Sequence, residues 1–210
     1  MADPERIAIL GGTFDPIHRG HLEPMLAIAA DMGWSRILFV PAATQPFKTG
    51  RAITAPHHRW AMAALATAGE ERLVLSDVEL RRGAISYTVD TLEELKREYP
   101  GRGFEWVVGD DNLELLMKWR RIERIFELAN FVVLRRDETP VPAELRSRLA
   151  EPAGRPPAGR IVPVSSRLVP LSATEIRARC GRGDPISGMV APAVEEYISK
   201  YGLYRAEEQM

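Results

Sequence analysis

Residues 6–21 read RIAILGGTFDPIHRGH, and this stretch decides the fold. Its first part, Arg6–Leu10, is a short apolar run that predicts a buried β-strand. A helical pattern begins at Leu22, so Gly11 and Gly12 fall between the strand and the helix. Glycines there allow the backbone to approach a ligand without a Cβ in the way. The start of a helix offers unpaired N–H groups and a positive dipole end. The stretch therefore predicts a site for a nucleotide phosphate.

Two of the four histidines, His18 and His21, lie at the end of this stretch. Their spacing in a helix would place both imidazoles on one face, and Gly20 would keep the space between them open. The alternative is a tight turn in which Asp15 and Pro16 are turn formers and the histidines are ordinary polar residues. The combination of Gly-Gly-Thr, Phe-Asp-Pro and His-x-Gly-His favours the phosphate site, because each part serves the same chemistry.

The rest of the chain alternates between strand-like and helix-like patterns. Strands are predicted at Ile7–Leu10, Ile37–Val40, Leu73–Leu75, Trp106–Val108, Phe131–Leu134 and Ile161–Val164. Helices are predicted at Leu22–Met32, His57–Ala68, Val89–Tyr99, Leu113–Phe126 and Pro142–Leu149. This rhythm is typical of an α/β protein with a doubly wound parallel sheet and helices on both faces. In such sheets ligands bind beyond the carboxyl ends of the strands, where Gly11 is expected to lie.

Composition limits the remaining classes. A chain of 210 residues is predicted to form one domain over 1–210, with a mobile Pro- and Gly-rich surface loop at 151–160. The formal net charge of −1 gives no electrostatic case for nucleic acid or an anionic membrane. The single cysteine, Cys180, excludes an intramolecular disulfide. With no apolar run of about 20 residues and no visible signal peptide, the cytoplasm is the expected location.

The stretch from Gly11 to His21 closely resembles the signature (T/G)-x-GTFDP-x-H-x-GH of the nucleotidyltransferase superfamily. A second stretch, Leu171–Arg177, by itself predicts a helix capped by Ser172 with Glu175 as its capping-box partner. It also resembles the second signature of the superfamily, (I/S)-S-x-T-x-IR. Together the two resemblances imply a Rossmann-like fold of the nucleotidyltransferase type and transfer of a nucleoside monophosphate to an acceptor phosphate.

Further motifs resemble those of the bacterial nicotinate mononucleotide adenylyltransferases, in the same order along the chain. They are Pro41–Lys48, His58-Arg59 with Met62, Arg82 with Ser86–Leu92, Gly109–Leu113 with Lys118-Trp119, and Phe131–Arg136. Without the resemblance, Ser86 or Thr88 would be read as a helix cap and Trp119 as a core residue. One departure is that 184–192 lacks the basic residue that family members often carry there.

The resemblance assigns roles to particular residues. Catalysis would fall to His18, His21, Lys48 and Arg177. ATP would be bound by Gly11, Gly12, Thr13, Phe14, His18, His21, Gly109, Asp111, Ser172, Thr174 and Arg177. The acceptor, nicotinate mononucleotide, would be bound by Lys48, Thr88, Trp119 and Arg135. No carboxylate cluster suggests a resident metal site, so Mg²⁺ is expected to arrive with ATP.

Alternatives remain open. The acceptor could be nicotinamide mononucleotide or another phosphate, because the acid and the amide of the pyridine ring differ only locally. The chain could also be a catalytically silent nucleotide-binding sensor, although pure binding does not require His18, His21 and Arg177 together. The sequence leaves open whether the protein forms a homo-oligomer.

Overall fold

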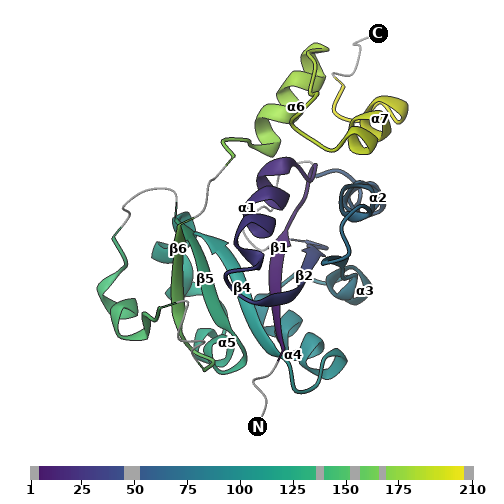
Figure 1. The fold of residues 1–210 in the computed structure, drawn as a ribbon. Helices are drawn as coiled ribbons and strands as arrows, with labels where there is room; N and C mark the ends of the chain where they lie inside the picture. Colours follow the sequence, from purple (N-terminus) through teal and green to yellow (C-terminus); the bar gives the residue numbers. More distant parts are fainter. Residues whose placement is uncertain (1–4, 45–52, 136–139, 152–156, 166–168, 206–210) are drawn as a thin grey trace.

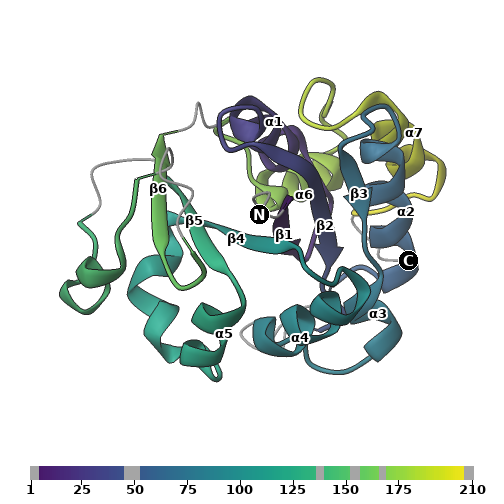
Figure 2. The same cartoon turned by 60° about the horizontal axis from the view of Figure 1, so that its bottom comes forward.

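The centre of the protein is a six-stranded parallel sheet with the strand order β3-β2-β1-β4-β5-β6. The computed structural model describes residues 5–44, 53–135, 140–151, 157–165 and 169–205. The strands are β1 (Arg6–Gly12), β2 (Trp34–Pro41), β3 (Leu73–Leu75), β4 (Gly103–Gly109), β5 (Asn130–Arg135) and β6 (Ile161–Ser165). Figure 1 shows β2, β1, β4, β5 and β6 side by side with helices around them, and Figure 2 also labels β3.

Helices cover both faces of this sheet (Figures 1 and 2). One apolar core includes residues of α1 (Arg19–Ala29), α2 (Pro56–Thr67), α6 (Ala173–Arg182) and α7 (Pro192–Lys200). The other core includes residues of α3 (Val78–Arg82), α4 (Thr88–Glu98), α5 (Ile122–Leu128) and the 3₁₀ helices η1 (Asp110–Lys118) and η2 (Ala143–Arg148). The strands serve both cores because successive side chains point to opposite faces. Ala8 belongs to the first core, and Ile7 and Ile9 belong to the second.

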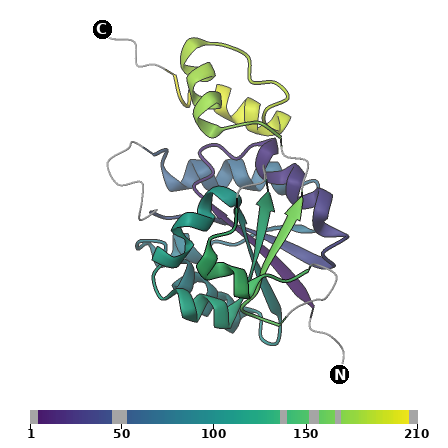
Figure 3. The same ribbon diagram turned by 90° about the vertical axis from the view of Figure 1, so that its left-hand side faces the viewer.

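The order of the strands creates a switch point between β1 and β4. The chain runs from β1 to β2 and β3 on one side, then returns to place β4 on the other side of β1. Open parallel sheets bind ligands in the crevice beyond the carboxyl ends at such a point. Figures 1 and 3 place α6 and α7 above this end of the sheet, opposite the N-terminus. The predicted fold class, a doubly wound α/β sheet, is confirmed.

The six predicted strands are all present, but one predicted helix is wrong. The pattern over Leu113–Phe126 predicted a continuous helix, whereas the chain forms η1, breaks, and restarts as α5. At the break, Trp119 is extended (φ −68°, ψ 141°) and Arg121 has a positive φ of 54°. No glycine or proline marks this break in the sequence, and apolar residues face the core on both sides of it. The predicted helix over Pro142–Leu149 is the short η2.

None of the helices formed by the described residues is both long enough and apolar enough to span a bilayer.

Candidate active site

Gly11 and Gly12, predicted to follow the strand, are the last two residues of β1, and close packing inside the protein requires both of them. A Cβ on Gly11 would lie 2.9 Å from Trp106 of β4, and one on Gly12 would lie 2.7 Å from the ring of Phe14. Phe14 itself has a positive φ of 50° and a ring that is 2% exposed. The side chain of Phe14 is therefore part of the core, so only its backbone is placed to serve the ATP role suggested for it.

His18 and His21 lie on one face at the start of α1, as their spacing predicted. Their rings stack with centroids 3.7 Å apart and planes 26° apart. Gly20 does not hold the rings apart. Instead it makes room for the ring of His18, because a Cβ on Gly20 would lie 3.0 Å from His18 Nδ1 and 3.3 Å from the carbonyl of Val169. The His18 N–H donates to Nδ1 of His21 at 3.2 Å. An accepting Nδ1 places the proton of a neutral His21 ring on Nε2.

Burial lowers the pKa of His18 from its usual 6.5 to about 4. The side chain is 6% exposed, and desolvation disfavours the charged imidazolium. At neutral pH and without a bound anion, His18 is therefore an uncharged imidazole. It can donate one hydrogen bond, and a nearby phosphate would favour its protonation.

The first turn of α1 exposes fewer backbone donors than the sequence suggested. The N–H of Arg19 donates to the carbonyl of Met189 at 3.0 Å, and the N–H of His21 donates to the carbonyl of His18 at 2.8 Å. The Arg19 guanidinium also donates to the carbonyl of Gly188 at 2.9 Å. The connection between α6 and α7 is thus joined to the start of α1, and the histidine side chains carry more of the site than the helix terminus does.

The start of α6 brings the second signature to the same place. Ser172 is the N-cap, as predicted, and its hydroxyl accepts a hydrogen bond from the N–H of Glu175 at 3.1 Å. The Glu175 carboxylate pairs with Arg179. Arg177 donates to the carbonyl of Asp15 at 2.7 Å and to the hydroxyl of Thr174 at 3.2 Å. Arg177 therefore reaches the loop after β1, and it lies within one site with the histidine signature.

Asp15 joins that loop to two distant segments. Its carboxylate accepts a hydrogen bond from the hydroxyl of Tyr204 at 2.8 Å and from the N–H of Thr54 at 3.3 Å. Burial and the adjacent carboxylate of Asp15 raise the pKa of Tyr204, so its hydroxyl stays protonated as a donor. The sequence suggested only a turn-forming role for Asp15, and the part played by Tyr204 was not foreseen.

Arg59 is a second residue whose position the sequence did not predict. It resembled part of a family motif, but its side chain is 1% exposed inside the protein. Its guanidinium donates to the carbonyls of Thr13 (2.8 Å), Ala42 (2.7 Å), Ala43 (3.4 Å) and Thr54 (2.9 Å). A signal was available in the sequence. Arg59 stands three and four positions before the apolar residues Met62 and Ala63, so it lies on the buried face of α2.

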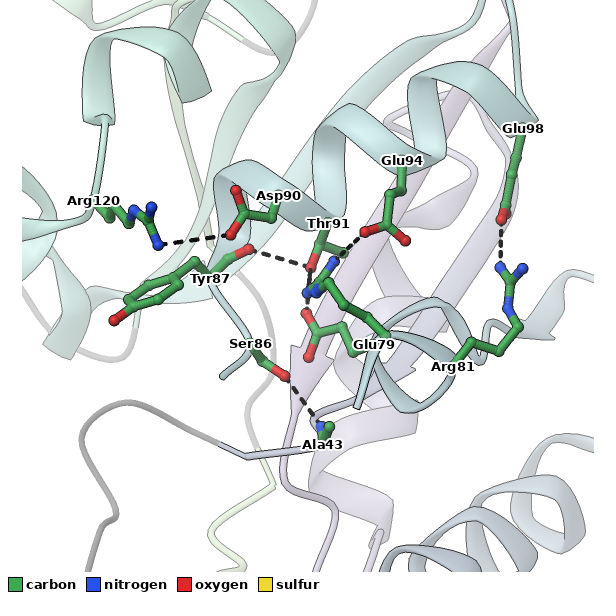
Figure 4. A network of polar contacts seen from close by, with 11 residues as sticks. Ala43, Glu79, Arg81, Ser86, Tyr87, Asp90, Thr91, Glu94, Glu98 and Arg120 are labelled. Atoms are coloured by element: carbon green, nitrogen blue, oxygen red, sulfur yellow. Dashed lines mark hydrogen bonds and ion pairs between the residues drawn. The ribbon is translucent and has the colours of Figure 1, made fainter. Parts of the chain in front are cut away.

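The Ser86–Leu92 segment lies beside the loop after β2 (Figure 4). The N–H of Ala43 donates to the hydroxyl of Ser86 at 3.1 Å, and the N–H of Ser86 donates to the carbonyl of Thr44 at 2.8 Å. The predicted cap is wrong: the N-cap of α4 is Tyr87, which makes no side-chain capping bond, and Thr88 is the first helical residue. Ser86 is used for the contact between loops, which leaves the helix without a hydroxyl cap.

A buried network of polar side chains connects this segment to α3. Thr91 donates to Glu79 at 2.6 Å and accepts from Arg82 at 3.0 Å, and Arg82 also pairs with Glu94 at 2.7 Å. Burial raises the pKa of Glu79, and hydrogen bonds from Ser86 and Thr91 oppose that rise. Arg82 thus connects α3 to Thr91 and Glu94 of α4.

The other predicted acceptor residues lie at the ends of neighbouring elements. Trp119 is half-buried at the break after η1, with its ring 5.8 Å from that of Phe131 and nearly perpendicular to it. Arg135 is the last residue of β5, level with Ser165 of β6.

Gly109 and Asp111 stand at the end of β4, next to the switch point. A Cβ on Gly109 would lie 2.5 Å from the carboxylate of Asp111, which accepts a hydrogen bond from Asn112 at 3.0 Å. The side chain of Asp111 therefore turns back over Gly109. Lys48 lies outside the described residues. Among the residues described, no group of three or more His, Cys, Asp or Glu side chains could hold a metal ion.

A cavity of about 460 Å³ lies away from these residues, where α5 and η2 meet the chain before β6. It is lined by Met117, Glu123, Glu144, Ser147, Arg148, Pro157, Ala158, Gly159 and Arg160. None of the residues predicted for catalysis or binding lines it.

Comparison with known proteins agrees with the fold and shows the family. The chain belongs to the cytidylyltransferase-like family, whose model matches residues 9–179. A protein of Thermomicrobium roseum, named "Probable nicotinate-nucleotide adenylyltransferase", is 41% identical over 98% of this chain and 94% of its own length. A protein of Laribacter hongkongensis with the same name is 40% identical over 96% and 95%. Within the family, the chain is a member of the nicotinate-nucleotide adenylyltransferases.

Solved structures share the architecture. The nicotinic acid mononucleotide adenylyltransferase of Plasmodium falciparum in complex with NaAD superposes with a TM-score of 0.74. It covers 95% of this chain and 97% of that one at 20% identity. The same enzyme in complex with APC gives a TM-score of 0.71 with the same coverage and identity. At this level of identity the likeness concerns the fold.

Proposed function

We propose that this protein transfers the adenylyl group of ATP to nicotinate mononucleotide, giving nicotinate adenine dinucleotide and pyrophosphate. An oxygen of the acceptor phosphate forms a bond to the α-phosphorus of ATP. The bond between that phosphorus and the oxygen bridging to the β-phosphate breaks, and this oxygen leaves with pyrophosphate. No covalent enzyme intermediate is needed, since such transfers depend mainly on positioning and charge stabilisation.

The proposal rests on one observation, which is that the two signature stretches of the sequence contact each other next to the switch point of the sheet. The stacked His18 and His21 follow β1, and Arg177 of α6 bonds to the carbonyl of Asp15 in the same loop. A pair of imidazoles and a guanidinium beside the same loop suits the charges of a triphosphate.

In this reading, His18 and His21 stabilise the charge that grows on the α-phosphate oxygens. His18 begins as a neutral donor, because its pKa is about 4 in the unliganded protein. The phosphates would favour a charged imidazolium as they bind, so His18 would gain its proton where charge develops. Arg177 and the hydroxyls at the start of α6 would steady the leaving pyrophosphate, and we assign Lys48 to the same task.

Mg²⁺ is proposed to enter with ATP. The described residues provide no carboxylate-rich cluster for a resident ion, so the donors would be phosphate oxygens and water. When bound, the ion would neutralise part of the charge on the phosphates. The chain's own contribution is then to orient the triphosphate through Arg177, Ser172 and Thr174.

The acceptor side is assigned to Thr88, Trp119 and Arg135. The half-buried Trp119 offers an aromatic face that suits a pyridine ring. Nicotinamide mononucleotide is the second candidate acceptor, because the amide has the same ring and phosphate.

The decisive experiment measures pyrophosphate release with ATP and a panel of acceptors. We expect kcat/KM to be highest for nicotinate mononucleotide. Equal or better use of nicotinamide mononucleotide would overturn the acceptor assignment. Binding of ATP with no turnover of any acceptor would support the sensor alternative.

A further inference from the structure

We propose that Arg59 is the positioning residue that sets the geometry of the nucleotide-binding loop, although it touches no substrate. Its guanidinium is the centre of a buried set of hydrogen bonds that joins the loop after β1 to the loop after β2 and to Thr54. The inference rests on the proposed function for the binding of ATP at this loop and for the acceptor used to measure turnover.

The burial of Arg59 excludes a direct catalytic role. With Arg59 only 1% exposed, its guanidinium cannot reach a ligand bound at the surface of the protein. Burying an arginine is costly unless its charge and donors are satisfied. Here the donors meet four backbone carbonyls, and the Asp15 carboxylate supplies a nearby negative charge. Because burying this charge is costly, we infer that Arg59 does more than fill space in the core.

The partners of Arg59 show what it holds. Thr13 belongs to the predicted phosphate loop, and its carbonyl is fixed at 2.8 Å from Nη1. Fixing a carbonyl also fixes the peptide plane that carries the next N–H. The same Nη1 holds the carbonyl of Ala42 at 2.7 Å. Two loops from neighbouring strands are thereby locked to one atom.

Thr54 connects the hydrogen bonds of Arg59 to Asp15 and, through it, to Arg177. Its carbonyl accepts from Nε of Arg59 at 2.9 Å, while its N–H donates to Asp15 at 3.3 Å. The carbonyl of Asp15 in turn accepts from Arg177 at 2.7 Å. Arg59 is therefore connected, through backbone and Asp15, to the arginine assigned to the triphosphate. The planar fork of arginine suits several fixed carbonyls, which the single ammonium of lysine cannot match.

The test is Arg59→Lys, with Arg6→Lys as a matched control. Arg6 is also largely buried and paired, with its Nη1 2.5 Å from Glu105, but it lies at the amino end of β1, away from the site. Both variants keep the charge and lose the fork. The measurements are the melting temperature and the Kd for a non-hydrolysable ATP analogue, taken at 10 °C without acceptor, followed by turnover with nicotinate mononucleotide.

We expect both variants to melt earlier than the native protein. Only Arg59→Lys should bind the analogue about ten- to hundredfold more weakly, the range for losing a charged hydrogen bond, and Arg6→Lys should stay within about twofold. If the Kd of Arg59→Lys for the analogue equals that of Arg6→Lys, the proposal is overturned. Arg59→Gln, which keeps a planar donor, serves as the second variant. Failure of both Arg59 variants to fold at 10 °C would make the residue structural and would also overturn it.

The two proposals can fail separately. If the native protein makes no dinucleotide from nicotinate mononucleotide but Arg59→Lys loses the analogue, the proposed function fails and the positioning role stands. If the native protein makes the dinucleotide and Arg59→Lys binds the analogue normally, the positioning role fails alone.

Discussion

Replacing His18 by glutamine should flatten the dependence of stability on acidic pH. In the native protein the imidazole is held neutral, with a pKa lowered from 6.5 to about 4 by burial. The unfolded chain therefore binds more protons than the folded one between these values, and stability rises with pH across that window. The stability that depends on a neutral His18 is therefore fully present above about pH 6.5. It is lost from the free energy of unfolding as the pH falls toward 4.

The size of the effect follows from the two pKa values. When the pH falls from 7.5 to 4.5, this one group should lower the free energy of unfolding by about 2–3 kcal/mol. The figure follows because one pKa unit corresponds to about 1.36 kcal/mol. That is a substantial part of the about 5–15 kcal/mol by which folded proteins are stable.

The assay is urea unfolding of the native protein and of His18→Gln at pH 4.5 and 7.5. The free energy of unfolding of the native protein should fall by about 2–3 kcal/mol more than that of the variant. His57→Gln, at an exposed site, controls for removal of a histidine from the surface. Equal losses in the native protein and His18→Gln would refute the argument that burial keeps His18 neutral.

Three further outcomes are expected. Arg177→Ala should raise the KM for ATP in steady-state kinetics, because the phosphates are held before reaction, and an unchanged KM would remove Arg177 from the ATP site. Trp119→Ala should raise the KM for nicotinate mononucleotide about tenfold, because it removes both the stacking and the burial of the pyridine ring. The KM for ATP should stay within about twofold. A lower melting temperature with both KM values unchanged would show that the contact of Trp119 with Phe131 is purely structural. Gly11→Ala should lower the free energy of unfolding in urea by about 1–3 kcal/mol, since its Cβ would lie 2.9 Å from Trp106, and a stability equal to that of the native protein would show that the indole can move aside.

The sequence predicted the sheet and the position of the loop after β1 well. Apolar runs bounded by turns identify buried strands, and all six predicted strands lie in the sheet. The Ser172 cap was also correct, because capping by a hydroxyl is a local interaction. The spacing of His18 and His21 correctly predicted that their rings lie on the same side, but it did not predict that the rings stack or that His18 is the extended N-cap of α1.

Long-range contacts set the features that the sequence did not reveal. At the break, Trp119 packs against Phe131 of β5, a contact between distant positions that the local helical pattern does not reveal. Ser86 bonds to the N–H of Ala43, from a loop more than 40 positions earlier, and so does not cap α4. The reason for Gly11 lies in Trp106, which only the strand order brings beside it.

The bond between Tyr204 and Asp15 has a consequence for synthesis of the protein in the cell. The two residues are 189 positions apart, so the loop after β1 gains this contact only after Tyr204 has left the ribosome. The sheet strands, which end at Ser165, emerge earlier and can pair first. Arg177 likewise reaches Asp15 only once α6 has been made. The nascent chain could thus pair its strands before the loop after β1 gains these contacts, and a ribosome stalled shortly before Tyr204 would carry a sheet whose loop after β1 still lacks the bond from Tyr204.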